Sequence, residues 1–157
     1  PCGTRGEAAS MSASASSRFG VHVGGVALLL PPELACEFVA GATVVPLPRA
    51  GRRVLGLTQL RGQPVVVLDA SAHPGAHPPA LRRHSVVVLG GPPDGAAIVV
   101  DEAPEPVRAG ATLADASPPE CAFASALEGA VEDAADPSRA WWRFDPRRLF
   151  EALAGPA

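Results

Sequence analysis

The sequence predicts a mainly β protein on the basis of three observations. Short apolar runs recur along its 157 residues, and each is bounded by glycine- or proline-rich turns. Strand-like segments do not alternate with helical ones, which excludes the βαβ order of parallel-sheet proteins. Apolar residues make up 47% of the chain and charged residues 18%, a balance typical of a globular protein. Many short strands with tight turns and a terminal helix are typical of small barrels or a sandwich.

The first predicted elements are a hairpin and a short helix. Arg18 to Leu30 alternates and then becomes continuously apolar, and Gly24-Gly25 supplies a turn that divides it into two strands. Pro31-Pro32 ends the second strand. A short helix is predicted over Glu33 to Val39, with the prolines at its start and Gly41 just beyond its end.

The next predicted elements are strands joined by a tight turn. Thr43 to Leu47 is β-prone, and its prolines make it a bent edge segment. Val54 to Leu60 is a strand that contains Gly56, and Arg61-Gly62-Gln63 is the turn that follows it. Pro64 to Leu68 is continuously apolar, which predicts a strand buried on both faces.

The second half of the chain contains another predicted hairpin. A glycine- and proline-rich turn, Gly90 to Gly95, separates the apolar runs Ser85 to Leu89 and Ala96 to Val100. Adjacent Trp141 and Trp142 point to opposite faces of a strand, so we expect one ring in the core and the other partly covered. Apolar residues alternate weakly over 107–113, and 118–131 is ambiguous between loop and helix. A strand is predicted over 140–144, followed by a helix that begins at Asp145-Pro146.

The composition of the N-terminal segment and the spacing of the cysteines indicate the domain organisation and the cellular compartment. Residues 1–17 are rich in serine, alanine and glycine and lack the apolar core of a signal peptide, so we expect a disordered tail followed by one domain, 18–157. Met11, the only methionine, is a candidate for the natural start. No apolar run has the length of a membrane-spanning helix. Cysteines at positions 2, 36 and 121 have no disulfide or zinc spacing, which favours a cytoplasmic protein with Cys36 buried.

The net charge of −3 is unevenly distributed along the chain. Six arginines and one acid lie between Arg49 and Arg83, whereas nine acids and one arginine lie between Asp101 and Asp136. Nucleic-acid-binding proteins usually combine a dense basic surface with aromatic residues, and the basic segment here contains no aromatic residue. The charge pattern therefore favours solvated loops of opposite sign and argues against a nucleic-acid partner.

The sequence shows no recognisable catalytic or metal-binding arrangement. His73 and His77 have a spacing that suits a metal only on a helix, and the proline and glycine between them exclude a helix. Asp101 and Glu102 end a strand and point to opposite faces, so they are poorly placed to share a substrate. A G-x-S-x-G element and a glycine-rich phosphate loop are both missing. We therefore expect no enzyme activity, no catalytic residue, no metal and no cofactor.

Arg61 and its neighbours carry a resemblance to a known family. A planar guanidinium in a turn is either solvated or bound to carbonyls or a carboxylate. The turn Gly56-Leu-Thr-Gln-Leu-Arg-Gly62 and the strand Pro64-Val-Val-Val-Leu-Asp69 resemble the G-[VIL]-x-N-L-R-G and V-x-P-V-[VI]-D-L motifs of the CheW-like domain family. Glu37-Phe38 resembles its Glu-Ile pair, and Ala97-Ile-Val-Val-Asp101 its G-[IL]-[LV]-V-D strand. Phe144 to Leu149 resembles its closing strand and helix start, so the resemblance runs from about Arg18 to the C-terminal helix.

The resemblance implies both a fold and a function. Members of the family fold as two small five-stranded, SH3-like β-barrel subdomains packed together. They act as cytoplasmic, non-enzymatic adaptors that join methyl-accepting chemoreceptor tips to the regulatory domain of a CheA-type histidine kinase, without inserting into the membrane. Carried over residue by residue, the resemblance implies that Glu37, Gly56, Arg61 and Gly62 make or shape the partner contact.

Departures from the family pattern leave alternatives open. Gln59, Val66, Ala70 and Ala97 each replace a residue that the family commonly has, and Ala35 stands where a valine is frequent, which implies a shallower groove. The chain is therefore an adaptor of a chemotaxis pathway, a divergent adaptor of the twitching-motility (PilI) type, or a degenerate relative retained as a structural or inhibitory partner. A small β-barrel that binds a ligand or nucleic acid is the alternative from another class.

Overall fold

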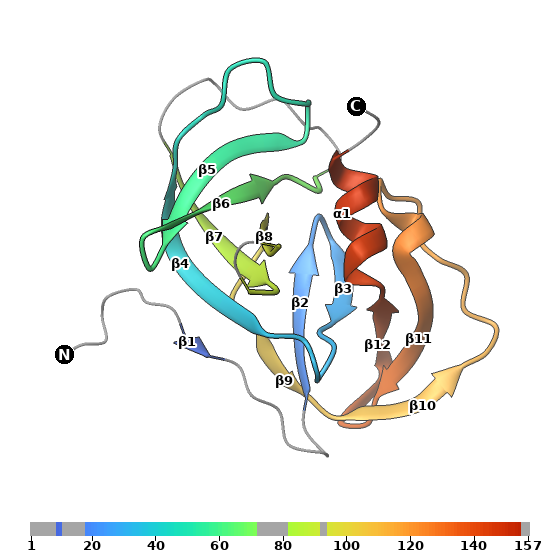
Figure 1. The fold of residues 1–157 in the computed structure, drawn as a ribbon. Helices are drawn as coiled ribbons and strands as arrows, with labels where there is room; N and C mark the ends of the chain where they lie inside the picture. Colours follow the sequence, from blue (N-terminus) through green and yellow to red (C-terminus); the bar gives the residue numbers. More distant parts are fainter. Residues whose placement is uncertain (1–8, 11–17, 72–81, 92–93, 155–157) are drawn as a thin grey trace.

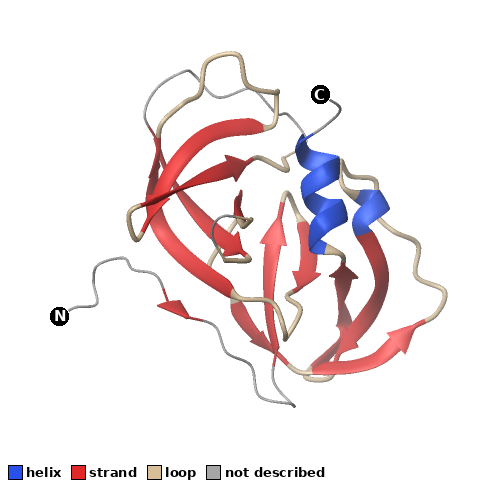
Figure 2. Cartoon of the chain, in the orientation of Figure 1, coloured by secondary structure: helices blue, strands red, loops and turns tan. Residues whose placement is uncertain are grey.

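The described strands form two sheets, accompanied by one α-helix (Figure 1). The structure is a computed structural model that describes residues 9–10, 18–71, 82–91 and 94–154. Strands dominate both halves of the molecule (Figure 2), which confirms the mainly β prediction.

The first sheet has six strands in the order β1-β4-β7-β8-β6-β5. All its neighbouring strands are antiparallel except β6 and β8, which are parallel. Its strands are β1 (Ala9–Ser10), β4 (Cys36–Val44), β5 (Val54–Leu60), β6 (Gln63–Leu68), β7 (Arg82–Leu89) and β8 (Ala96–Val99).

The second sheet combines an N-terminal hairpin with strands from the C-terminal third of the chain, in the order β10-β11-β12-β3-β2-β9. The hairpin joins β12 through a parallel contact of β3, at Leu28 and Trp142, and joins β9 through antiparallel pairing of β2. No single cut in the chain therefore separates the two sheets. Its strands are β2 (Arg18–Val23), β3 (Val26–Leu29), β9 (Glu105–Val107), β10 (Ala109–Leu113), β11 (Leu127–Asp133) and β12 (Asp136–Phe144), followed by α1 (Pro146–Ala154).

The hairpins and the C-terminal helix form as predicted. Gly24 and Gly25 both have positive φ, 57° and 85°, as a two-residue turn between right-twisted strands requires. Antiparallel pairing of β7 with β8 confirms the second predicted hairpin. Asp145 Oδ1 accepts a 2.9 Å hydrogen bond from the backbone N–H of Arg147, which makes Asp145 the N-cap of α1.

The short helix predicted over Glu33 to Val39 is wrong. Residues from Cys36 onward form β4, which is paired with β7 along most of its nine residues. Gly41, expected just beyond a helix, instead has φ of 67° within an irregularity between Val39 and Ala42 that bends the strand. The long-range ladder satisfies more backbone groups than one isolated helical turn, so it overrides the local preference.

Other expectations are refined by the structure. In β6 burial alternates at first, since Val65 and Val67 are 4% and 0% exposed and Val66 is 37% exposed. Leu68, on the same face as Val66, is 3% exposed, so the predicted burial on both faces holds only at the end of the strand. The ambiguous segment 118–131 contains a short 3-10 turn, η2 (Ala124–Ala126), and the start of β11. Ala9–Ser10, which we expected to be disordered, form β1. The rest of the tail, and His73 and His77, lie outside the described residues.

The first sheet closes on itself where β4 ends. Val45 and Leu57 exchange two backbone hydrogen bonds of 2.8 and 2.9 Å between the extension of β4 and β5. Gly56, with φ of 152°, permits this approach, because a Cβ there would lie 2.0 Å from the carbonyl oxygen of Val45. Without β1 the first sheet has the five strands that the family resemblance implied, whereas the second has six.

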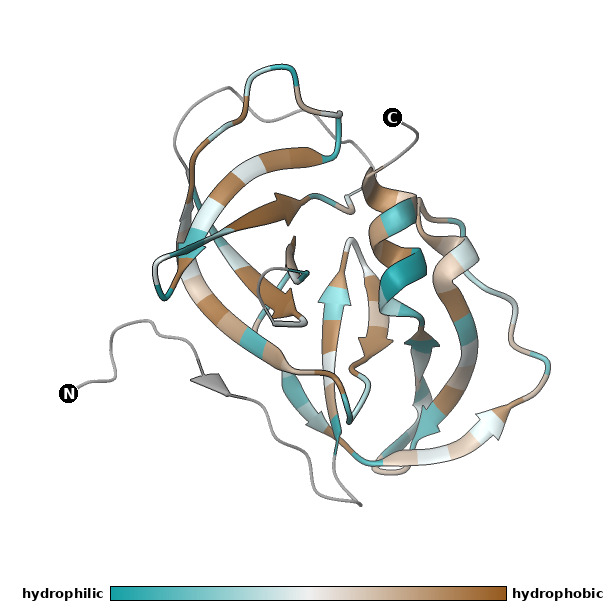
Figure 3. Ribbon diagram, in the orientation of Figure 1, coloured by the Kyte–Doolittle hydropathy of each residue, from teal (hydrophilic) through white to brown (hydrophobic). Residues whose placement is uncertain are grey.

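The largest core cluster draws side chains from both sheets and from α1. Apolar and polar residues alternate along several strands, which gives each sheet an inward apolar face (Figure 3). Trp141 is fully buried, and Trp142 is half-buried against the core, as the strand geometry predicts. The fully or nearly fully buried members of the cluster include Val23, Leu28, Val87, Leu89, Ile98, Phe123, Leu149 and Leu153.

Replacement of Gly56 by alanine tests the closure of the first sheet. Because the added methyl group overlaps the Val45 carbonyl and the backbone is left-handed, we expect Gly56→Ala to lower the free energy of unfolding by about 3 kcal/mol in urea denaturation. Gly25→Ala is the matched control, since Gly25 also has positive φ but a Cβ there would meet nothing within 4 Å. Its cost is expected to be about 1 kcal/mol. Equal losses in the two variants would contradict the steric argument.

Cys36 provides a test of core burial. Burial raises the pKa of its thiol from 9.0 to about 11, so the stability contributed by the protonated thiol persists below pH 9 and is lost between pH 9 and 11. At pH 8 we expect iodoacetamide to alkylate Cys36 about a hundredfold more slowly in the folded protein than in urea, because the thiolate is the nucleophile. Peptide mass spectrometry measures both rates, with half-buried Cys121 as the internal reference. Equal rates in the two states would show that Cys36 is not buried.

Candidate functional site

The turn between β5 and β6 presents Arg61 at the end of the first sheet. Leu60 pairs with Gln63, so the turn consists of two residues, Arg61 and Gly62. Both have positive φ, 51° and 78°, which is the geometry of a type I′ hairpin turn. The turn is one residue shorter than predicted, since Gln63 already belongs to β6.

Arg61 occupies a backbone conformation that its side chain disfavours. Asparagine or glycine is the usual residue at the first central position of such a turn, and a left-handed conformation costs other residues about 1 kcal/mol or more. The β5–β6 ladder on either side holds the backbone in place. A retained left-handed arginine is the kind of local strain that concentrates at functional sites.

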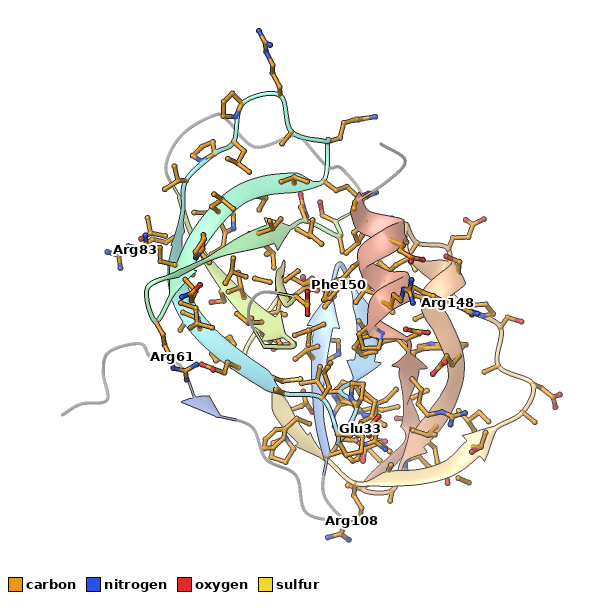
Figure 4. All side chains as sticks on the ribbon, viewed as in Figure 1. Glu33, Arg61, Arg83, Arg108, Arg148 and Phe150 are labelled. Carbon is orange, nitrogen blue, oxygen red and sulfur yellow. The ribbon has the colours of Figure 1, made fainter. Side chains whose placement is uncertain are left out.

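Arg61 is paired with Glu37 on β4. Nη1 of Arg61 donates to Oε1 of Glu37, and the two side chains differ sharply in exposure, 65% for Arg61 and 18% for Glu37. The Arg61 side chain reaches from the turn toward β4 (Figure 4). The second carboxylate oxygen, Oε2 of Glu37, is buried and has no hydrogen-bond partner among the described residues. The pair therefore presents exposed guanidinium donors, whereas the carboxylate that holds them is mostly buried.

A groove lies beside this pair, between β4 and β5. Its volume is about 560 Å³, and its walls are mostly apolar. Val39 of β4, two residues after Glu37, and Leu60 of β5, next to Arg61, both line it. Val45, at its rim, is 55% exposed, more than Leu47 or Val66, which are each 37% exposed. The remaining lining residues are Ala42, Thr43, Leu57, Thr58, Gln59, Pro64 and Val88.

The structure brings some of the predicted site residues together and separates another. Glu37, Arg61 and Gly62 lie at one place, because β4 and the β5–β6 turn meet there. Gly56 lies at the contact with Val45, where it shapes the sheet rather than the ion pair. The resemblance implied a groove shaped by Ala35, but Ala35 does not line this one. The sequence did not indicate its actual lining, because that lining comes from strands that are neighbours only after the sheet closes. Val45, an apolar residue just before a proline, was the available signal.

A second cavity, of about 500 Å³, lies between β3 and the start of α1. Arg18 lines it, and its Nη2 donates to the backbone oxygen of Leu30 at 3.3 Å. Burial lowers the pKa of the Arg18 guanidinium; Glu33 opposes that effect and Arg143 adds to it. Carboxylates and guanidinium groups are mixed along this cavity, so it has no single charge that would select an anion or a cation.

The acidic pair considered in the sequence has structural roles. Asp101 accepts hydrogen bonds from the backbone N–H groups of Gly24 and Gly25, at 3.2 and 2.8 Å, and so ties the end of β8 to the β2–β3 turn. Glu102 lies 3.4 Å from Nδ1 of His22. The two carboxylates thus face different partners. Within the described residues, no group of three or more His, Cys, Asp or Glu side chains has the arrangement of a metal site.

Comparisons with known proteins agree with this architecture. The family model described as CheW-like domain matches residues 18–151. The chain is similar to the crystal structure of the scaffolding protein TtCheW from Thermoanaerobacter tengcongensis, with a TM-score of 0.61 and 14% sequence identity over 88% of this chain and 90% of that one. No curated protein matches the sequence. Among the described helices, none is long and apolar enough to cross a membrane.

Proposed function

The chain belongs to the CheW-like domain family, and from that premise we propose that it is a non-enzymatic adaptor coupling chemoreceptors to a CheA-type histidine kinase. Members of the family are scaffold or adaptor proteins, and the match extends over nearly all of the described chain. As such an adaptor it acts in the cytoplasm, at the receptor arrays of a chemotaxis or twitching-motility pathway.

The Glu37–Arg61 pair is the observation that carries the receptor half of this proposal. A small-molecule site usually encloses its ligand, whereas Arg61 is mostly exposed on a protruding turn. The exposed guanidinium offers planar donors to a carboxylate or carbonyl of a partner. A partner surface that carries such an acceptor pairs with the Arg61 guanidinium, which Glu37 holds in position. We assign this pair to the chemoreceptor tip.

The apolar groove supports the kinase half of the proposal. Protein contacts commonly centre on an apolar surface with polar groups at its rim. Val45 and the groove walls supply such a surface. The regulatory domain of CheA-type kinases resembles this fold, so a barrel-on-barrel contact is the association we assign to the groove.

Arg61→Asn tests the receptor contact. Asparagine tolerates the left-handed backbone, so relief of strain offsets the loss of the ion pair between exposed Arg61 and the mostly buried Glu37. We expect the free energy of unfolding to stay within about 1 kcal/mol of the parent value. We expect the affinity for a soluble receptor-tip fragment, measured by calorimetry, to fall by about tenfold or more, because truncating an interface arginine commonly costs more than about 1 kcal/mol.

Arg49→Asn is the matched control for this variant. Arg49 is also exposed and has positive φ, 61°, but it belongs to another turn. Its replacement should leave receptor affinity unchanged. An Arg61→Asn variant that binds the receptor tip as the parent does, or one that unfolds, would refute the assignment of Arg61 to the receptor contact.

Val45→Asp tests the kinase contact. A carboxylate at the rim of the groove would be desolvated by an apolar partner, so we expect affinity for the kinase regulatory domain to fall at least about tenfold while receptor-tip affinity is retained. Val66→Asp is the control, since Val66 is a partly exposed valine outside the groove lining. Unchanged kinase binding by Val45→Asp, or an equal loss in both variants, would remove the groove from the kinase interface.

A further inference from the structure

The backbone of β4 has an edge beside Glu37 that β7 does not use. The backbone N–H of Gly90 donates to the oxygen of Ala35 at 2.7 Å, just outside the β4–β7 ladder. Because hydrogen-bonding direction alternates along an antiparallel strand, Glu37 and Val39 turn their backbone groups toward β7. Phe38, between them, turns its N–H and C=O the other way.

The pairing of β7 with β8 leads independently to the same hydrogen-bonding directions for β7 and β4. The backbone N–H of Val100 donates to the oxygen of Ser85 at 3.0 Å, which directs the odd-numbered residues of β7 toward β8. Its even-numbered residues therefore face β4, and Val88 lies opposite Glu37 in that register. The two observations agree that Phe38 points away from β7.

β1 lies along this edge. Ala9 is paired with Phe38, and Ser10 with Glu37, in an antiparallel register (Figure 1). Since Phe38 directs its backbone groups toward β1, Ala9 is the residue in the hydrogen-bonded position and Ser10 directs its own N–H away from β4. β1 therefore lies directly opposite Glu37, the residue whose carboxylate pairs with Arg61.

We propose that Ala9–Ser10 is an intramolecular strand that competes with the chemoreceptor for the β4 edge beside the Glu37–Arg61 pair. A receptor segment that pairs with the β4 edge at Glu37 and Phe38 must displace Ala9–Ser10, so this segment lowers receptor affinity. A strand of two residues forms few hydrogen bonds, so a receptor can readily displace it. Such weak pairing is what a reversible competitor requires. The effect on affinity rests on the proposed function, whereas the pairing itself does not.

Two proline variants distinguish the loss of the β1–β4 pairing from other effects of introducing a proline. Ala9→Pro removes the N–H that faces Phe38, so it disrupts the pairing. Ser10→Pro, the matched control, removes an N–H that points away from β4, which an edge strand tolerates. A chain that begins at Met11 lacks β1 altogether. We expect the Phe38 amide to exchange with solvent about tenfold faster in Ala9→Pro and in the shortened chain, and at the parent rate in Ser10→Pro, by NMR hydrogen exchange.

Receptor binding tests the competition. We expect Ala9→Pro and the shortened chain to bind a soluble receptor-tip fragment about threefold to tenfold more tightly than the parent, and Ser10→Pro to match the parent. Equal exchange rates of the Phe38 amide in the parent, both proline variants and the shortened chain would overturn the pairing of β1 with β4. Faster exchange with unchanged or weaker receptor binding would overturn the competition. If none of the proteins binds the receptor tip, both the competition and the proposed receptor function fail, while the exchange data still decide the pairing.

Discussion

The approach of β5 to the end of β4 is the contact on which the candidate site depends. Val45 and Leu57 exchange backbone hydrogen bonds there, and only a residue without a Cβ fits at Gly56. Once the two strands meet, the β5–β6 turn faces β4, and Arg61 reaches Glu37. The same contact encloses the apolar groove. A backbone position with no direct part in binding therefore sets the geometry of both proposed partner contacts.

β4 connects the structural and the proposed functional parts of the first sheet. One edge pairs with β7 along most of its length, and the opposite edge is divided between β1 near Phe38 and β5 near Val45. The groove occupies the interval between those two contacts. This division explains how one strand can offer an ion pair, an apolar surface and a strand-pairing edge within a few residues of one another.

The second sheet supports this surface from behind. Asp101, just after β8, holds the β2–β3 turn through two backbone hydrogen bonds, and the main core cluster takes side chains from both sheets. Because the β2–β3 hairpin precedes the first sheet's longer strands and β9 to β12 follow them, neither sheet is an independent unit. A core shared by the two sheets suits a protein whose proposed role is to hold two partners in a fixed relation.

Elements with local signals were predictable from the amino-acid sequence. The Gly24-Gly25 turn, the Asp145 cap and the strand at Val54 to Leu60 follow from turn chemistry, capping and periodicity, and the motif around Arg61 identified the family. Other features depend on how the whole chain folds. Glu33 to Val39 has a helix-compatible sequence, but β7 offers its second half a continuous ladder, so it becomes part of β4. The Glu37–Arg61 contact, the groove and the β1 pairing all join residues distant in sequence, and such contacts depend on chain closure that no local pattern encodes.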